Sequence, residues 1–302
     1  MKHLRNFAFA FVVFALSVTV FGQKTQIRQV ITKAPVQTSA PWQELKLASK
    51  LTAREMPYRV ILPKNYDSAK ESRFPVLYLL HGLTGHFDNW TDKTKLKDYA
   101  NSYDYIIVTP EGNDGWYTDA ANVPNDKYES YITQELIPEI DAKFRTLADR
   151  DHRAIAGLSM GGYGSLKFGL KFPDKFSVVG SFSGALGAAS WTVKNLGALS
   201  GWKALTDSIA NVYGADESPT RRDNDIYKIV REMSPEKAKV LPFMYVDCGT
   251  EDGLIQQNRD FSALLVEKKI PHEFRELPGK HDWIFWDSQI QEFLRVSQKF
   301  IK

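Results

Sequence analysis

Ser159 lies between two glycines, at a point where a strand is expected to turn into a helix. It is the third residue of Gly157-Leu-Ser-Met-Gly161, which matches the pattern G-x-S-x-G. The apolar residues 154–156 favour a strand before it, and residues 162–168 favour a helix after it. Flanking glycines permit the sharp, strained turn that exposes a serine hydroxyl as a nucleophile. A glycine-rich turn of purely structural use is the alternative interpretation.

A serine hydroxyl needs a base to remove its proton, and the histidines that follow Ser159 are the candidates. Strand-turn-helix nucleophiles of this kind are followed in the chain by an acid and then by a histidine. His272 lies within an expected strand, where an exposed edge position is the simpler interpretation. His281 lies in the loop at 278–283, between the last expected strand and the last helix, where it can be directed at the serine. We therefore predict His281 as the base.

The acid that orients the imidazole should lie in a loop after a strand, between Ser159 and His281. The segment Asp247-Cys-Gly-Thr-Glu-Asp-Gly253 contains three acids. Asp247 still belongs to an apolar run and is expected to bond locally. Asp252, the shorter of the two acids in the loop itself, precedes the turn at Gly253 and is the favoured candidate. Glu251 is the second candidate.

Backbone N–H groups that stabilise an oxyanion are expected at two places. One is the N–H of Met160, the residue after the candidate nucleophile. The other belongs to the loop His81-Gly-Leu-Thr-Gly85, which directly follows the apolar run 78–80. We assign it to Leu83. The place of His81 before Gly82 favours a role in shaping this loop over a role as a base.

Short apolar runs alternate with amphipathic segments along most of the chain. A hairpin is expected at 44–52 and 54–62. Runs that are apolar on both faces, separated by helices, indicate a mainly parallel sheet covered by helices. The expected later strands are 75–80, 105–109, 153–158, 177–182, 242–248 and 272–277, and the clearest helices are 129–144, 162–170, 257–268 and 287–300. Residues 185–237 interrupt the alternation, with a short helix near 225–233, and are expected over the open strand ends.

Five motifs in order resemble the putative-esterase branch of the α/β-hydrolases. This branch includes S-formylglutathione hydrolase (esterase D), the feruloyl and acetylxylan esterases of carbohydrate esterase family one, and the mycolyltransferases of the antigen 85 complex. The resemblance covers about residues 42–300. The motifs are His81-Gly-Leu-Thr-Gly85, Glu111-Gly-Asn-Asp-Gly-Trp-Tyr117, Gly157-Leu-Ser-Met-Gly-Gly162, Cys248-Gly-Thr-Glu-Asp252 and Gly279-Lys-His-Asp-Trp283.

The resemblance implies one α/β-hydrolase domain at 42–302, with a mainly parallel central sheet, an N-terminal antiparallel hairpin and helices on both faces. It also implies the residues already reached: Ser159, Asp252 and His281 as a triad, with Leu83 and Met160 as oxyanion donors. We expect neither a cofactor nor a metal, because the sequence contains no pattern typical of a metal site and no Gly-rich phosphate-binding loop after the first parallel strand.

The first 22 residues are typical of a secretory signal peptide. Lys2 and Arg5 precede an apolar stretch at 7–21, which is shorter than the ~20 apolar residues that a membrane span needs. We therefore expect cleavage near Gly22, export to the periplasm or the medium, and no lasting membrane anchor. This departs from the cytosolic members that hydrolyse glutathione thioesters. Residues 23–41 are polar and are expected to be a loosely ordered lead-in.

Aromatic residues near the expected active face suggest the substrate. Flat rings suit sugars or a cinnamoyl group, although each tryptophan could equally pack the loops. The candidates for substrate binding are Trp116, Tyr117, Trp191, Trp202 and Trp283. With a formal net charge of +3 and no long basic block, a nucleic-acid partner is not expected.

The sequence therefore supports an exported serine esterase that removes feruloyl or acetyl groups from polysaccharides or their fragments. An acyltransferase, or a general short-chain or thioester hydrolase, is the alternative within enzymes. A non-catalytic binding module is the alternative outside them. All three residues of the candidate triad are present, which disfavours the binding module. The sequence predicts no oligomeric state.

Overall fold

The computed structural model describes residues 42–192 and 194–301, all of them within the unit Thr38–Lys302. The predicted signal peptide at 1–22 and the lead-in at 23–41 lie outside the described residues and stay predictions. In the described part of the chain, no helix is long and apolar enough to cross a membrane.

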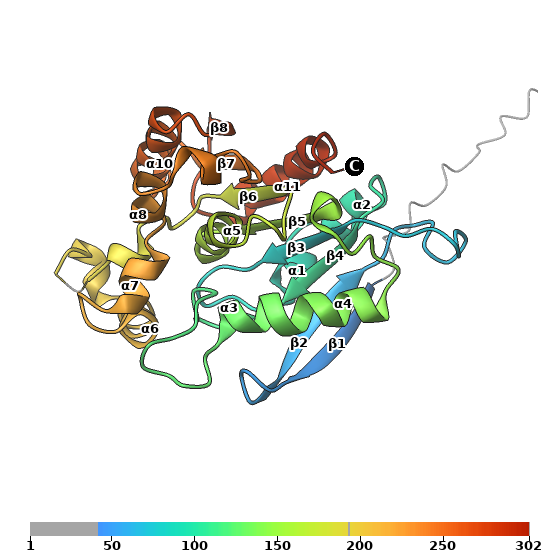
Figure 1. The fold of residues 1–302 in the computed structure, drawn as a ribbon, viewed down its shortest axis with the longest axis horizontal. Coiled ribbons are helices and arrows are strands. Elements are labelled where there is room, and N and C mark those ends of the chain that lie inside the picture. Colours follow the sequence, from blue (N-terminus) through green and yellow to red (C-terminus); the bar gives the residue numbers. More distant parts are fainter. Residues whose placement is uncertain (1–41, 193, 302) are drawn as a thin grey trace, which may run out of the picture. The chain divides into compact units, whose positions relative to one another are not determined.

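An eight-stranded sheet organises the described residues (Figure 1). Its order is β1-β2-β4-β3-β5-β6-β7-β8, and strands β3 to β8 run parallel to one another. The β1–β2 hairpin is antiparallel, and β2 also pairs antiparallel with β4. The strands are β1 (Trp42–Ser49), β2 (Arg54–Ile61), β3 (Val76–Leu80), β4 (Ile106–Pro110), β5 (Arg153–Leu158), β6 (Val178–Phe182), β7 (Phe243–Gly249) and β8 (His272–Leu277). The predicted mainly parallel sheet with an N-terminal hairpin is confirmed.

The two faces of the sheet bury separate apolar clusters, because successive side chains of a strand point to opposite faces. In β3, Val76, Tyr78 and Leu80 pack on one face, together with residues of α4, α5 and α10. Leu77 and Leu79 pack on the other, together with residues of α2 and α11. Both faces are covered by helices, so the central strands are buried throughout and read as continuous apolar runs.

The principal helices confirm the predicted alternation with strands. The segment predicted as a helix at 129–144 contains a π-helical stretch, η1 (Tyr131–Leu136), between two α-helical parts. The short helices α1 and α2 were not predicted. The α-helices are α1 (Asn89–Lys93), α2 (Leu96–Ala100), α3 (Tyr128–Ser130), α4 (Ile137–Lys143), α5 (Met160–Lys171), α6 (Lys203–Tyr213), α7 (Pro219–Asn224), α8 (Ile226–Arg231), α9 (Pro235–Ala238), α10 (Ile255–Glu267) and α11 (Trp283–Ser297).

The region between β6 and β7 contains the predicted insertion. Its elements are short: η3 (Ala188–Ser190), η4 (Gly197–Gly201) and α6 to α9. The remaining 3-10 helix, η2 (Arg150–His152), immediately precedes β5. The loops that follow β3, β5, β7 and β8 start from the same edge of the parallel sheet. Residues far apart in the sequence therefore meet at this edge, where ligands bind in open α/β sheets.

Candidate active site

Ser159 occupies a strained turn between β5 and α5. Its backbone has φ 52° and ψ −115°, in the positive-φ region that non-glycine residues seldom adopt. Two hydrogen bonds anchor the turn, one from its N–H to the carbonyl of Phe182 at 2.9 Å and one from the N–H of Ala185 to its carbonyl at 3.0 Å. A backbone held in this way points to a functional role for the side chain.

Glycines allow the turn to pack directly on the loop that follows β3. A Cβ on Gly161 would lie 2.6 Å from the carbonyl oxygens of both Leu80 and His81. A Cβ on Gly82 would lie 2.6 Å from a methyl group of Leu158. The two loops that carry the predicted oxyanion donors are therefore in close contact. Met160 is the first residue of α5, where the N–H has no acceptor within the helix.

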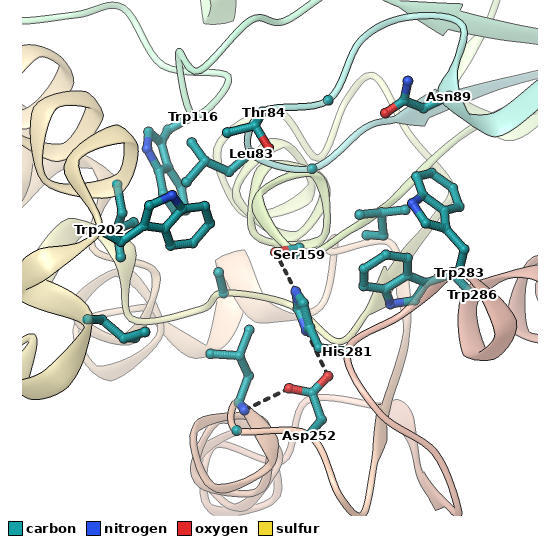
Figure 2. A pocket seen from close by; sticks show the side chains of 18 of the residues that line it. Leu83, Thr84, Asn89, Trp116, Ser159, Trp202, Asp252, His281, Trp283 and Trp286 are labelled. Atoms are coloured by element: carbon teal, nitrogen blue, oxygen red, sulfur yellow. Dashed lines mark hydrogen bonds and ion pairs between the residues drawn. The ribbon is translucent and has the colours of Figure 1, made fainter. Parts of the chain in front are cut away.

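Three side chains from three loops form one hydrogen-bonded chain (Figure 2). Ser159 Oγ lies 3.0 Å from His281 Nε2, and His281 Nδ1 lies 2.8 Å from Asp252 Oδ2. The second oxygen, Asp252 Oδ1, accepts the N–H of Leu254 at 2.8 Å. The structure thus brings together the three residues that the sequence predicted as a triad.

The other candidates for base and acid lie elsewhere. Glu251 is exposed, and its carboxylate is 3.7 Å from the ammonium of Lys280. The ring of His272 contacts Ser262 Oγ at 2.8 Å and the carbonyl of Ile270 at 3.0 Å, at the edge strand β8. Asp247 is fully buried in β7, and burial raises its pKa well above the usual aspartate value.

Asp252 is buried, and its surroundings favour the ionised carboxylate. Burial acts to raise the pKa of Asp252, but the hydrogen bond and attraction of His281, with the N–H of Leu254, outweigh it and lower that pKa. A buried carboxylate in this position holds the imidazole in one orientation and stabilises its protonated form. The arrangement can therefore perform proton transfer at Ser159.

Glu111 joins the loop after β4 to the loop after β3. Its carboxylate lies 3.2 Å from His81 Nε2 and 3.2 Å from His86 Nδ1, and it accepts the N–H of Asn113 at 2.7 Å. Burial acts to raise the pKa of Glu111, but the hydrogen bond and attraction of His81 and the N–H of Asn113 lower it to about 2. His81 is almost fully buried, so it shapes the loop that carries Leu83.

A cavity of about 390 Å³ opens beside Ser159. Most of its lining is apolar. Figure 2 shows Trp116 and Trp202 on one side of Ser159, and Trp283 and Trp286 on the other. We call Trp116, Trp191 and Trp202 the insertion wall. The opposite side, formed by Asn89, Lys93, Trp283 and Trp286, is called the α1–α11 wall; all seven residues line the cavity.

Tyr117 is the predicted substrate-binding residue that does not line the cavity. Its side chain is fully buried, and its hydroxyl donates to the carbonyl of His81 at 3.1 Å. Trp116 and Tyr117 both have φ 50°, and the ammonium of the buried Lys167 holds this turn by donating to the Tyr117 carbonyl at 2.6 Å. The turn directs Trp116 to the cavity and Tyr117 beneath the loop after β3, so Tyr117 supports the site from below.

Sequence reasoning missed several cavity residues, of which Trp286 is the clearest. The predicted helix began at 287, whereas α11 begins at Trp283 because the Asp282 side chain accepts the N–H of Phe285 at 3.0 Å and caps it. Trp286 lies one helical turn after Trp283 and faces the same way. The Asp282 cap was the sequence signal that could have revealed it. Asn89 and Lys93 belong to α1, which was not predicted.

Within the described residues 42–192 and 194–301, no group of three or more His, Cys, Asp or Glu side chains is placed to hold a metal ion.

In comparison with protein-family models, residues 49–296 match the family described as putative esterase. The chain belongs to this family. It is 29% identical over 256 residues to an acetyl esterase of Caldicellulosiruptor saccharolyticus, covering 82% of this chain and 94% of that protein. It is 29% identical over 275 residues to the S-formylglutathione hydrolase of Mus musculus, covering 82% and 89%.

Two further relatives extend the comparison. The chain is 32% identical over 244 residues to Esterase Rv1288 of Mycobacterium tuberculosis, covering 74% of this chain and only 51% of that longer protein. Among solved structures, a ferulic acid esterase is 29% identical, with a TM-score of 0.74 over 87% of this chain and 99% of its own. The α/β-hydrolase fold and the esterase family are thus established, and membership supports the hydrolysis of esters.

Proposed function

We propose that this protein is a serine esterase in which Ser159, His281 and Asp252 are the catalytic triad. The observation that carries the proposal is the hydrogen-bonded chain from Ser159 Oγ through His281 to Asp252, at 3.0 and 2.8 Å, beside an aromatic cavity. The strained backbone of Ser159 and the membership in the esterase family support it.

In the proposed reaction, Ser159 Oγ attacks the carbonyl carbon of the ester while His281 Nε2 takes the hydroxyl proton. The tetrahedral oxyanion accepts hydrogen bonds from the N–H groups of Leu83 and Met160. His281 then protonates the leaving oxygen, and the alcohol departs from an acyl-enzyme. Water, deprotonated by His281, attacks the acyl-enzyme and releases the acid. Asp252 stabilises the imidazolium at each transfer.

The proposed substrates are feruloyl or acetyl esters of polysaccharides or their fragments. The tryptophans on both sides of Ser159 offer flat apolar surfaces that suit sugar rings and cinnamoyl groups. An acetyl esterase and a ferulic acid esterase are among the proteins most similar to this chain. Export is part of the proposal and rests on the signal-like residues 1–22.

A side-by-side hydrolysis assay tests the proposal. The substrates are 4-nitrophenyl acetate, methyl ferulate and an acetylated xylo-oligosaccharide. Ser159→Ala and His281→Ala should each lower kcat by about 10⁴-fold or more. His272→Ala is the matched control and should retain activity, because His272 lies away from Ser159. If Ser159→Ala equals the wild type on all three substrates, the proposal is wrong.

The relative turnover of the three substrates by the wild type tests the substrate assignment. Faster turnover of methyl ferulate or the acetylated sugar than of 4-nitrophenyl acetate supports the polysaccharide-esterase assignment. Turnover of 4-nitrophenyl acetate alone supports the triad and contradicts that assignment. Transfer of the acyl group to an added sugar acceptor, in preference to water, would identify an acyltransferase instead.

A further inference from the structure

The α1–α11 wall lies on the side of Ser159 where His281 is held. The His281 ring packs edge-on against Trp286, with ring centroids 4.9 Å apart and an interplanar angle of 89°. Trp286 packs in the same way on Trp283, at 5.2 Å. In the proposed reaction His281 Nε2 gives its proton to the leaving oxygen, so that oxygen lies within hydrogen-bond reach of His281. In this reaction the leaving group extends along the α1–α11 wall, beside the rings that pack on His281.

Lys93 places a positive charge on this wall. Its ammonium lies 5.1 Å from the centroid of the Trp283 ring, over the face of the indole. Apart from Asp252 and His281, which are bonded to each other, Lys93 is the one charged residue among the described residues that line the cavity.

Nearby carboxylates are engaged with other groups. Asp92 accepts from the Arg59 guanidinium at 2.5 Å, and Asp88 accepts from the amide of Asn89 at 2.9 Å. Within residues 42–192 and 194–301, no carboxylate lies within 4 Å of the Lys93 ammonium. Lys93 is an exposed cation at the edge of a mostly apolar cavity and has no carboxylate of its own, so it can pair with an anionic group of a ligand.

We infer that the α1–α11 wall binds a leaving group that carries a carboxylate, which pairs with Lys93 while an apolar part of the group stacks on Trp283. This inference rests on the proposed esterase function. A uronic acid residue of a polysaccharide, as an alcohol, and a carboxylate-bearing peptide thiol both have the required chemistry.

Matched ester pairs test the inference. The first pair places the charge on the leaving group: 4-acetoxybenzoate against its methyl ester. The second pair places it on the acyl group: mono-4-nitrophenyl terephthalate against its methyl ester. For each enzyme we compare the charged-to-neutral ratio of kcat/KM, so that intrinsic reactivity cancels between variants. Turnover of the neutral esters reports the proposed function separately.

Lys93→Met should lower the ratio of the first pair by about threefold to fivefold, since Lys93 is an exposed cation. Lys93→Glu should lower it further, by about tenfold. Sodium chloride should lower the ratio of the wild type and leave that of Lys93→Met nearly constant. The matched control is Lys97→Met, since Lys97 also lies over an indole, that of Trp42 at 5.4 Å, but does not line the cavity.

An unchanged ratio for the first pair in Lys93→Met and Lys93→Glu overturns the inference. A change confined to the second pair overturns the placement of the leaving group. If the inference is upheld, two further pairs distinguish a uronic acid alcohol from a peptide thiol as the leaving group. They are an acetylated methyl glucuronoside against its methyl ester, and S-acetylglutathione against its diethyl ester. The leaving-group class that this wall recognises is that of the pair whose ratio depends more strongly on Lys93.

Discussion

At the scale of single residues, two adjacent acids differ sharply in their surroundings. Asp252 has a side chain that is 1% exposed and contacts His281, whereas the side chain of Glu251 is 61% exposed. Only the carboxylate of Asp252 can orient the imidazole. Asp252→Asn should therefore lower kcat by about 10⁴-fold, because an amide favours the wrong tautomer of His281. Glu251→Gln, one residue away, should stay within about twofold of the wild type.

Steady-state kinetics on 4-nitrophenyl acetate measure both variants, and circular dichroism checks that they fold. Equal losses in Asp252→Asn and Glu251→Gln, or a larger loss in Glu251→Gln, would contradict the assignment of the acid.

Glu111 connects two loops through its carboxylate, and the folded protein favours the ionised form of that carboxylate. Its pKa in the fold, about 2, is below that of an unfolded glutamate, so ionised Glu111 stabilises the fold above pH ~4.5. This contribution is lost as the pH falls from about 4.5 toward 2. Glu111→Gln should therefore lower the free energy of unfolding at pH 7 by roughly 2–3 kcal/mol, and the deficit should shrink below pH 4.5.

Urea unfolding of the wild type and Glu111→Gln at pH 7, 5 and 4 measures this deficit. Glu251→Gln serves as the control, because that side chain is exposed. A deficit that stays constant, or grows, as the pH falls would show that the charge of Glu111 is not the stabilising feature.

At the scale of elements, the turn between β5 and α5 packs so closely on the loop after β3 that position 161 has room only for glycine. An alanine Cβ at Gly161 would meet two carbonyl oxygens at 2.6 Å, and neither belongs to a flexible side chain. Gly161→Ala should push the loop after β3 away from Ser159. We expect kcat/KM on 4-nitrophenyl acetate to fall by about 100-fold or more, with a loss of stability of about 1–3 kcal/mol.

The control for this substitution is Gly201→Ala, where a Cβ would meet no atom within 4 Å. Activity of Gly161→Ala equal to that of Gly201→Ala would mean that the backbone contact does not position the site.

At the scale of the whole sheet, β8 is an edge strand that pairs on one side with β7. Its polar residues Glu273 and Arg275 bond to each other, and Arg275 also bonds to Glu292 of α11 at 2.5 Å. Charges on an edge strand oppose pairing with another chain. Replacing both Glu273 and Arg275 by valine should raise the average mass in solution as concentration rises, measured by light scattering.

The pair Glu273→Gln and Arg275→Lys keeps the edge polar and should behave as the wild type. Equal masses for the valine and polar pairs at every concentration would argue against protection of this edge by charge.

Local patterns in the sequence predicted much of the fold and the three residues of the candidate triad, with Asp252 favoured over Glu251 as the acid. Apolar runs predict β3 to β7, polar–apolar alternation predicts β8, and helical periodicity predicts the principal helices, because strand and helix periods are properties of neighbouring residues. Ser159 follows from its glycines, and His281 from chain order. The helix predicted from 287 lacks the first turn of α11, which begins at Trp283 because Asp282 caps it.

Only the tertiary structure buried Asp252 against His281 while leaving Glu251 exposed, turned Tyr117 beneath the site, and assembled the α1–α11 wall. The antiparallel pairing of β2 with β4 likewise became known only from the tertiary structure. Each of these features depends on which distant segment of the chain packs against a residue. For neighbouring residues such as Asp252 and Glu251, a shift of one position decides whether the side chain faces the interior or the solvent. Local periodicity carries no information about that partner. The sequence by itself therefore determined the principal strands and helices and the order of the candidate catalytic residues along the chain. Packing at one edge of the sheet decided which side chains meet.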